Sequence, residues 1–225
     1  MEKKAVSGIM LTLLLTGMLT LAFNIVCVYA EVQVGVKTGD WIKIDYTITG
    51  APSGTSVPTW IGMGFLSVKG TNAIVKVTMH MSDGTEPTDI MFVDVATGNG
   101  TFQGLSGFVI PANCTTGDSI YMNEYGNVTL DGETTKTYAG ASRTVVYTSF
   151  SKYGSQLIYY WDKETGVIVE TSTISSVSTI IAKITETNMW EAVSSPFWMQ
   201  WWFYAIVAVA IGALVGTVYF LKKRK

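Results

Sequence analysis

Short runs of alternating apolar and polar residues make up most of the sequence between residues 31 and 192. In Trp41-Ile42-Lys43-Ile44-Asp45-Tyr46-Thr47-Ile48 the even-numbered residues are apolar. Successive side chains of a strand point to opposite faces, so this spacing places the apolar residues on one face. No window of the segment shows the spacing of an amphipathic helix. The pattern therefore predicts an all-β domain.

Composition supports this interpretation, since residues 31–192 contain 16 Val, 14 Ile and 25 Thr but only 4 Leu. β-branched residues suit a pleated surface and lose side-chain freedom in a helix. Turn residues separate the runs, which predicts an antiparallel meander forming either a sandwich or a curved, half-barrel-like sheet. The predicted strands are 41–48, 61–68, 73–81, 90–95, 119–122, 128–130, 134–138, 143–150, 156–161, 167–174 and 179–187.

The N-terminus has the pattern of a secretory signal, because two lysines precede an apolar run from Ala5 to Val28. Val28-Tyr29-Ala30 fits a cut after Ala30, which predicts a signal peptide at 1–30. Two alternatives are an uncut membrane anchor and a lipid on Cys27, although a bulky valine precedes that cysteine.

The C-terminus has the pattern of a membrane span, because Phe203–Leu221 is 19 residues long and contains no charge. A helix of that length covers about 28 Å, close to the hydrocarbon thickness of a bilayer. Basic residues follow at 222–225, and Trp198, Trp201 and Trp202 precede it as an interfacial belt would. These features predict an extracellular β-rich domain at 31–192, a juxtamembrane segment at 193–202, a single transmembrane helix at 203–221 and a cytoplasmic tail at 222–225.

Small residues recur along this span at Ala208, Gly212 and Gly216. Such spacing lets two helices approach closely, which predicts a homodimer through this face. Outside the membrane the charge is 9 Lys/Arg minus 16 Asp/Glu, or −7. That balance argues against a nucleic-acid partner.

Residues that carry chemistry are scarce. His80 is the one histidine and lies in Met79-His80-Met81, where alternation puts the histidine opposite the two methionines, so a copper site would need a bent strand. A nucleophile pair of Cys114 with His80 has no local support, because no basic residue adjoins Cys114. The common multi-ligand zinc patterns are excluded.

Other motifs are equally weak. The glycine-rich stretch at 98–107 lacks the P-loop lysine and predicts a loop. The acid pairs Asp89/Asp94 and Glu124/Asp131 could hold calcium, but their spacing matches no known loop. We therefore predict no catalytic residue, no cofactor and no metal, and a protein that is not an enzyme.

Three Asn-x-Thr sequons begin at Asn99, Asn113 and Asn127, which predicts glycosylation of an exported domain. Cys114 is the middle residue of the second sequon and is interpreted as a turn residue beside a sugar. The alternative is an intermolecular disulfide, which an odd cysteine in an exported protein invites.

A short repeat, Thr-Gly-Asp-x-Ile, begins at Thr38 and again at Thr116. It is interpreted as a shared turn that leads into a strand, with an internal duplication as the alternative.

Three stretches carry a resemblance: GDWIKIDYTITG at 39–50, FVIPANCTTGDSIY at 108–121 and YYWDKETGVIVETS at 159–172. With the C-terminal span and basic tail, they resemble uncharacterised archaeal cell-surface proteins that are exported and anchored by one helix. An aromatic strand followed by a Trp-Asp-x-x-Thr-Gly turn is also similar to the curved sheets of LolA/LppX-type lipoprotein carriers, which hold acyl chains on a concave face.

We expect a single-pass protein of the cell membrane with a binding or envelope-structural role and a lipid or glycan ligand. The alternative, which the second resemblance implies, is a carrier or sensor of lipid or isoprenoid chains. An enclosed apolar pocket of several hundred Å³ favours the carrier, whereas a fully packed core contradicts it.

Overall fold

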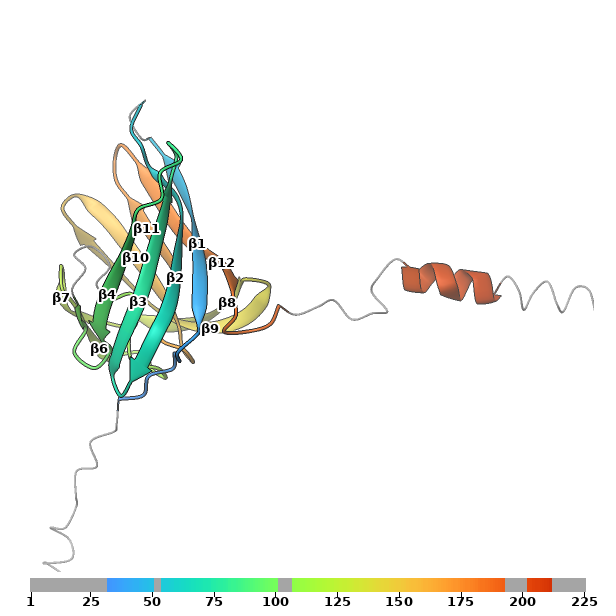
Figure 1. Ribbon diagram of the computed structural model, residues 1–225, viewed down its shortest axis with the longest axis horizontal. Coiled ribbons are helices and arrows are strands. Elements are labelled where there is room, and N and C mark those ends of the chain that lie inside the picture. The colour runs from blue at the N-terminus through green and yellow to red at the C-terminus, as the bar shows by residue number, and fades with distance from the viewer. Residues whose placement is uncertain (1–31, 51–53, 101–106, 193–201, 212–225) are drawn as a thin grey trace, which may run out of the picture. The chain divides into compact units, whose positions relative to one another are not determined.

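The computed structural model describes residues 32–50, 54–100, 107–192 and 202–211. Residues 33–192 form an all-β domain, apart from the gaps just given, and residues 202–211 form a short helix (Figure 1). In these ranges no helix is long and apolar enough to cross a membrane. The predicted signal peptide and the predicted span beyond residue 211 lie outside the described residues.

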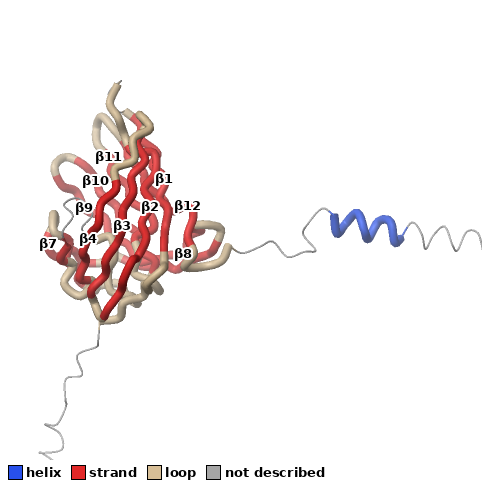
Figure 2. Tube along the Cα trace, viewed as in Figure 1, coloured by secondary structure: helices blue, strands red, loops and turns tan. Residues whose placement is uncertain are grey.

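Ten antiparallel strands form one curved sheet, in the order β5-β4-β3-β2-β1-β12-β11-β10-β9-β8 (Figures 1 and 2). Its strands are β1 (Trp41–Thr49), β2 (Pro58–Lys69), β3 (Asn72–Met81), β4 (Thr88–Asp94), β5 (Asn99–Gly100), β8 (Gly132–Tyr138), β9 (Ala141–Lys152), β10 (Ser155–Asp162), β11 (Ile168–Ile174) and β12 (Thr179–Thr187). Neighbours in the sheet are neighbours in the chain, except that β1 pairs with β12. The predicted antiparallel meander is confirmed, as a curved sheet and not as a sandwich.

A separate hairpin is made by β6 (Ser119–Met122) and β7 (Gly126–Thr129). The sequence predicts strands at these positions as further members of the meander, and that placement is wrong. The segment before the hairpin is tied to β11, because the Ile168 backbone N–H donates to the Phe108 carbonyl at 2.9 Å. Trp161 adds a bond from its indole Nε1 to the Gly107 carbonyl. The chain therefore leaves the sheet after β5 and returns to it at β8.

The core lies on the concave face of the sheet. In each strand, the apolar residues that face inward belong to the core. Examples are Ile42, Ile61 and Val75, each 1% exposed or less. The segment and hairpin add a second set of buried side chains: Phe108, Val109, Ile110, Ile120, Met122 and Leu130. Packing of these residues against the sheet covers part of the concave face.

The two Thr-Gly-Asp repeats form the same turn. Gly39 and Gly117 both have a φ of 92°, a conformation that favours glycine. In each turn the aspartate carboxylate accepts a backbone N–H three residues earlier, from Lys37 to Asp40 at 2.9 Å and from Thr115 to Asp118 at 2.7 Å. The shared-turn interpretation is therefore supported by geometry.

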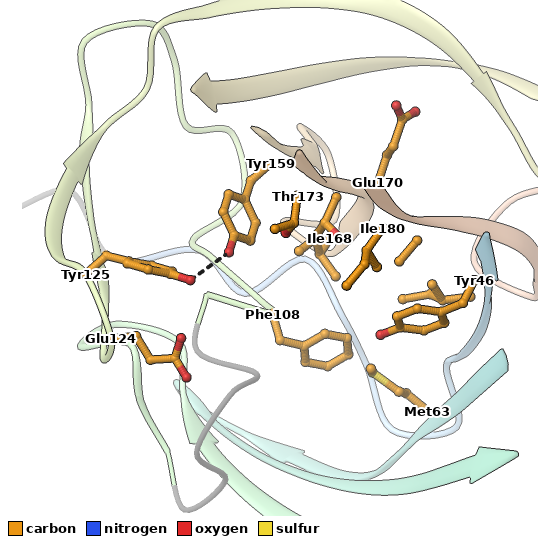
Figure 3. Close-up of a pocket in the computed structure, with 13 residues that line it drawn as sticks. Tyr46, Met63, Phe108, Glu124, Tyr125, Tyr159, Ile168, Glu170, Thr173 and Ile180 are labelled. Atoms are coloured by element: carbon orange, nitrogen blue, oxygen red, sulfur yellow. Dashed lines mark hydrogen bonds between the residues drawn. The ribbon is translucent and has the colours of Figure 1, made fainter. Parts of the chain in front are cut away.

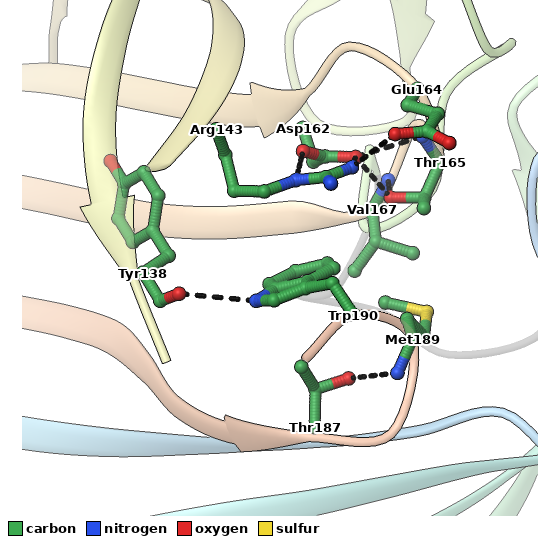
Figure 4. Close-up of polar contacts among 9 residues, drawn as sticks. All are labelled: Tyr138, Arg143, Asp162, Glu164, Thr165, Val167, Thr187, Met189 and Trp190. Carbon is green, nitrogen blue, oxygen red and sulfur yellow. Dashed lines mark hydrogen bonds and ion pairs between the residues drawn. The ribbon is translucent and has the colours of Figure 1, made fainter. Parts of the chain in front are cut away.

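The C-terminal end of the domain is fastened to the sheet by Trp190 (Figure 4). Its indole Nε1 donates to the Tyr138 carbonyl at 3.1 Å, and the Arg143 guanidinium lies 4.8 Å from its ring centroid. Arg143 in turn donates to both carboxylate oxygens of Asp162, at 2.7 and 2.9 Å. A buried ion pair thus supports the place where the chain leaves the domain.

Candidate functional site

The concave face is only partly filled. In β1, Ile42 and Ile44 are buried, whereas Tyr46 and Ile48, on the same face, are only half-buried. Between them and the hairpin lies a cleft of about 250 Å³ (Figure 3). It is lined by Ile44, Tyr46, Met63, Phe108, Glu124, Tyr125, Tyr159, Ile168, Glu170, Thr171, Thr173, Ile180 and Ala182.

The depth of the cleft comes from small residues that the strand register places side by side. Ala182 of β12 lies directly opposite Tyr46 of β1 and Thr171 of β11, and Thr171 lies opposite Tyr159 of β10. Two large aromatic side chains therefore flank two small ones in a single row across four strands. The row makes a floor of Ala182 and Thr171 between walls of Tyr46 and Tyr159.

The β6–β7 hairpin closes one side of the cleft with Tyr125. The Tyr159 hydroxyl donates to the Tyr125 hydroxyl at 3.3 Å, as Figure 3 shows. The Tyr125 ring meets Phe150 edge-on, with ring centroids 5.0 Å apart. Lys152 lies 4.9 Å from the Tyr125 ring centroid and donates to the Glu124 carbonyl at 2.7 Å. These contacts tie the hairpin to β9 and β10.

The lining carries little charge. Burial raises the pKa of Tyr46 and Tyr159, so both phenols stay neutral. The Glu170 carboxylate points away from the cleft (Figure 3), where both oxygens accept from Lys136 at 3.0 Å. Glu124 is exposed, beside Tyr125. The cleft therefore offers apolar walls and a few hydroxyl groups, which suits an apolar ligand.

Cys114 is half-buried, lies between two turns and packs against the core. Burial, with a smaller effect from the Asp118 charge, raises the pKa of its thiol to about 11, so it is protonated at neutral pH. No hydrogen bond in the described part of the chain joins it to His80. The proposed disulfide through Cys114 stays a prediction.

His80 lies on the outer face of β3, where its Nδ1 lies 2.9 Å from the Glu86 carboxylate and its ring stacks on Trp60. Residues Asn72–Met81 form one strand, which includes Met79 and Met81 as well as His80. Across the described ranges no group of three or more His, Cys, Asp or Glu side chains could hold a metal ion.

The paired acids that could have held calcium are used otherwise. Asp94 accepts from Thr97 and Ala96 in a turn, and Asp89 accepts from the adjacent Ile90 N–H. Asp131 accepts the Ser149 N–H at 2.6 Å, while Glu124 is exposed beside the cleft. The glycine-rich stretch at 98–107 includes β5, and its residues 101–106 lie outside the described residues.

The three sequon asparagines are all exposed, Asn99 in β5, Asn127 in β7 and Asn113 in a turn. Asn113 has a φ of 62°, and its side-chain amide donates to Gln33 at 2.7 Å. Glycosylation stays a prediction at each of them. Of the proposed helix-contact residues, Ala208 lies in the helix at 202–211, and Gly212 and Gly216 lie outside the described residues.

The cleft residues were not identified from sequence as a site. Tyr125 and Tyr159 meet only because the hairpin crosses to β10, 34 residues away in the chain. Ala182 and Thr171 become a floor only when the register is known. Alternation does place Tyr46 on the inner face, which is the single signal available beforehand.

No protein-family model matches the chain, and no curated protein matches it. Among solved structures, the hypothetical protein CT021 from Chlamydia trachomatis is similar over 71% of this chain and 91% of its own, with 8% identity and a TM-score of 0.37. At this level of similarity, function has to be inferred from the side chains of this chain.

Proposed function

We propose that the domain binds one apolar chain, of acyl or isoprenoid type, in the concave-face cleft. The observation that carries the proposal is the row of Tyr46, Ala182, Thr171 and Tyr159, which leaves about 250 Å³ between aromatic walls. Pockets for drug-sized ligands measure roughly 300–1,000 Å³. The cleft therefore suits a stretch of a single chain and not a whole two-chain lipid.

The role is a binding role at the cell surface, and not a catalytic one. Export by residues 1–30 and anchoring by residues 203–221 would place the cleft outside the membrane, as a carrier or sensor of such chains requires. The mostly uncharged lining supports this ligand class, because burying an unpaired charge beside an apolar chain is costly. The protonated Cys114 thiol and the Glu86-bound His80 support a non-catalytic role.

The test fills the cleft. Thr173→Phe adds a ring on the inner face of β11, and Ser172→Phe adds the same ring at the next residue, on the outer face. Both positions are half-buried. The full-length protein in detergent is titrated with cis-parinaric acid, a linear fluorescent fatty acid. The micelle background is common to all samples, so the difference between variants isolates the cleft.

We expect Thr173→Phe to lose the protein-dependent fluorescence and Ser172→Phe to keep it. Circular dichroism checks that both variants fold. If the two folded variants bind the probe as the wild type does, or if the wild type adds nothing to the micelle signal, the proposed ligand site is wrong.

A further inference from the structure

The outer face of β2 contains two glycines in the middle of a 12-residue strand, Gly62 and Gly64. Ile61, Met63 and Phe65 alternate with them and are buried on the other face. Glycine inside a strand costs roughly 0.5–1 kcal/mol relative to alanine, because it loses more freedom on folding. Such glycines often mark a place where a ligand or another backbone approaches closely.

Contacts within the domain explain why residue 62 is glycine, but they do not explain why residue 64 is glycine. A Cβ at position 62 would lie 3.3 Å from Cζ3 of Trp60, so the indole ring of Trp60 lies against this glycine. A Cβ at position 64 would meet nothing within 4 Å, and Gly64 does not have a positive φ. A larger residue would fit there, so the domain itself does not require glycine at position 64.

Two tryptophans stand beside this strip. Trp41 of β1 lies directly opposite Gly64 and is 39% exposed, and exposed Lys76 of β3 lies opposite Gly64 on the other side. Trp60 precedes Gly64 by four residues, which is about 13 Å along a strand. Trp41 therefore lies beside the open Gly64, and Trp60 lies further along the same face, with Gly62 between them.

Polar groups surround the indoles. The His80 ring is parallel to that of Trp60 within 8°, with centroids 5.3 Å apart, and Lys43 Nζ lies 5.8 Å from the Trp60 centroid. Lys43 is paired with Glu186 at 2.7 Å, and His80 with Glu86 at 2.9 Å. We call Trp41, Lys43, Trp60, Gly62, Gly64, Lys76 and His80 the tryptophan platform.

We propose that the tryptophan platform binds a neutral saccharide chain. A sugar ring has an apolar C–H face that packs on an indole and a rim of hydroxyls that need both donors and acceptors. The platform supplies aromatic faces at Trp41 and Trp60, and Gly64 leaves room for the chain to lie against the backbone beside Trp41. Lysine and glutamate side chains supply the donors and acceptors.

The same observations disfavour other occupants. Protein interfaces have apolar centres depleted of charged residues, whereas Lys43 and Lys76 lie between and beside the two indoles. Glu86 and Glu186 at the rim would be repelled by an anionic bilayer or an acidic polysaccharide. The platform lies on the opposite face of the sheet from the cleft, so this proposal does not depend on the proposed function.

Gly64→Val provides the test, because it separates binding from folding. The full-length protein in detergent is titrated calorimetrically with three neutral hexasaccharides, built of glucose, mannose or N-acetylglucosamine. Trp41→Ala removes one stacking surface, and Thr135→Val, at an exposed position of β8 away from the platform, is the control. Thermal unfolding of each variant is measured in parallel.

We expect the wild type and Thr135→Val to bind at least one hexasaccharide, and Gly64→Val and Trp41→Ala to bind it at least tenfold more weakly. The unfolding midpoint of Gly64→Val should be unchanged or higher, since valine suits a strand. The proposal is overturned if the wild type binds none of the three sugars, if either platform variant keeps full affinity, or if Gly64→Val lowers the midpoint.

Discussion

Asp162 shows at the scale of one residue how the domain holds its C-terminal end. It is 1% exposed, and its carboxylate accepts from Arg143 and from both the backbone N–H and the hydroxyl of Thr165, at 2.9 and 2.8 Å. Arg143 also donates to Glu164 at 2.7 Å, but the Glu164 side chain is 76% exposed. The same guanidinium thus has one buried and one exposed partner.

We expect Asp162→Ala to lower the free energy of unfolding by about 3–5 kcal/mol, because it leaves a desolvated cation and an unpaired N–H. Glu164→Ala, the matched control, should cost about 1 kcal/mol or less, as exposed ion pairs do. Urea unfolding followed by tryptophan fluorescence measures both. Equal losses in the two variants would contradict the assignment of Asp162 as the buried anchor of Arg143.

At the scale of elements, local sequence predicts the strands of the sheet well. The turn at 69–72 and the strands on either side of it follow from alternation and turn residues, and the structure confirms them. The position of the β6–β7 hairpin could not be predicted, because its alternation is that of any short strand. The segment before it is held to β11 by a long-range hydrogen bond, from the Ile168 backbone N–H to the Phe108 carbonyl.

In the proposed binding role, the hairpin forms the wall that retains the bound chain. Tyr125→Ala removes the hydroxyl contact to Tyr159 and the side wall of the cleft. We expect the dissociation rate of bound cis-parinaric acid to rise several-fold in stopped-flow experiments, because the wall then no longer retains the chain. Tyr121→Ala, on the same hairpin but 41% exposed and outside the cleft lining, is the control. Thermal unfolding of both variants checks that they are equally folded. Equal dissociation rates for Tyr125→Ala and Tyr121→Ala would contradict the claim that Tyr125 retains the chain in the cleft.

At the scale of the whole domain, the cleft lies where two halves of the sheet meet. One half runs from β5 to β1 and the other from β12 to β8. The cleft's lining residues on the sheet come from β1 and β2 on one side and from β10, β11 and β12 on the other. The β1–β12 pairing that joins them has a register shift between Lys43 and Ile44, and β10–β11 has one between Tyr160 and Trp161. Such irregularities bend strands and increase twist, which helps a ten-stranded sheet to curve.

This origin limits what sequence alone can reveal. Alternation predicts which face of β1 is apolar, but it does not distinguish a filled concave face from one that keeps a cleft beside Tyr46 and Ile48. The small residues that make the difference, Ala182 and Thr171, come from strands whose register is fixed only by the complete sheet. The strands can be predicted from local sequence, whereas the candidate site cannot, because its residues meet only through pairing of strands distant in the chain.

The most direct test of the cleft is to map where an apolar chain lies. A hexadecanol carrying a diazirine near its end is photolysed with the full-length protein, and the labelled peptides are identified by mass spectrometry. We expect label on the β11–β12 peptide that contains Thr171 and Ala182, and on the peptide that contains Tyr159, with loss of both in Thr173→Phe. Absence of label from these two peptides in the wild type, or its persistence in that variant, would contradict a chain-binding cleft on the concave face.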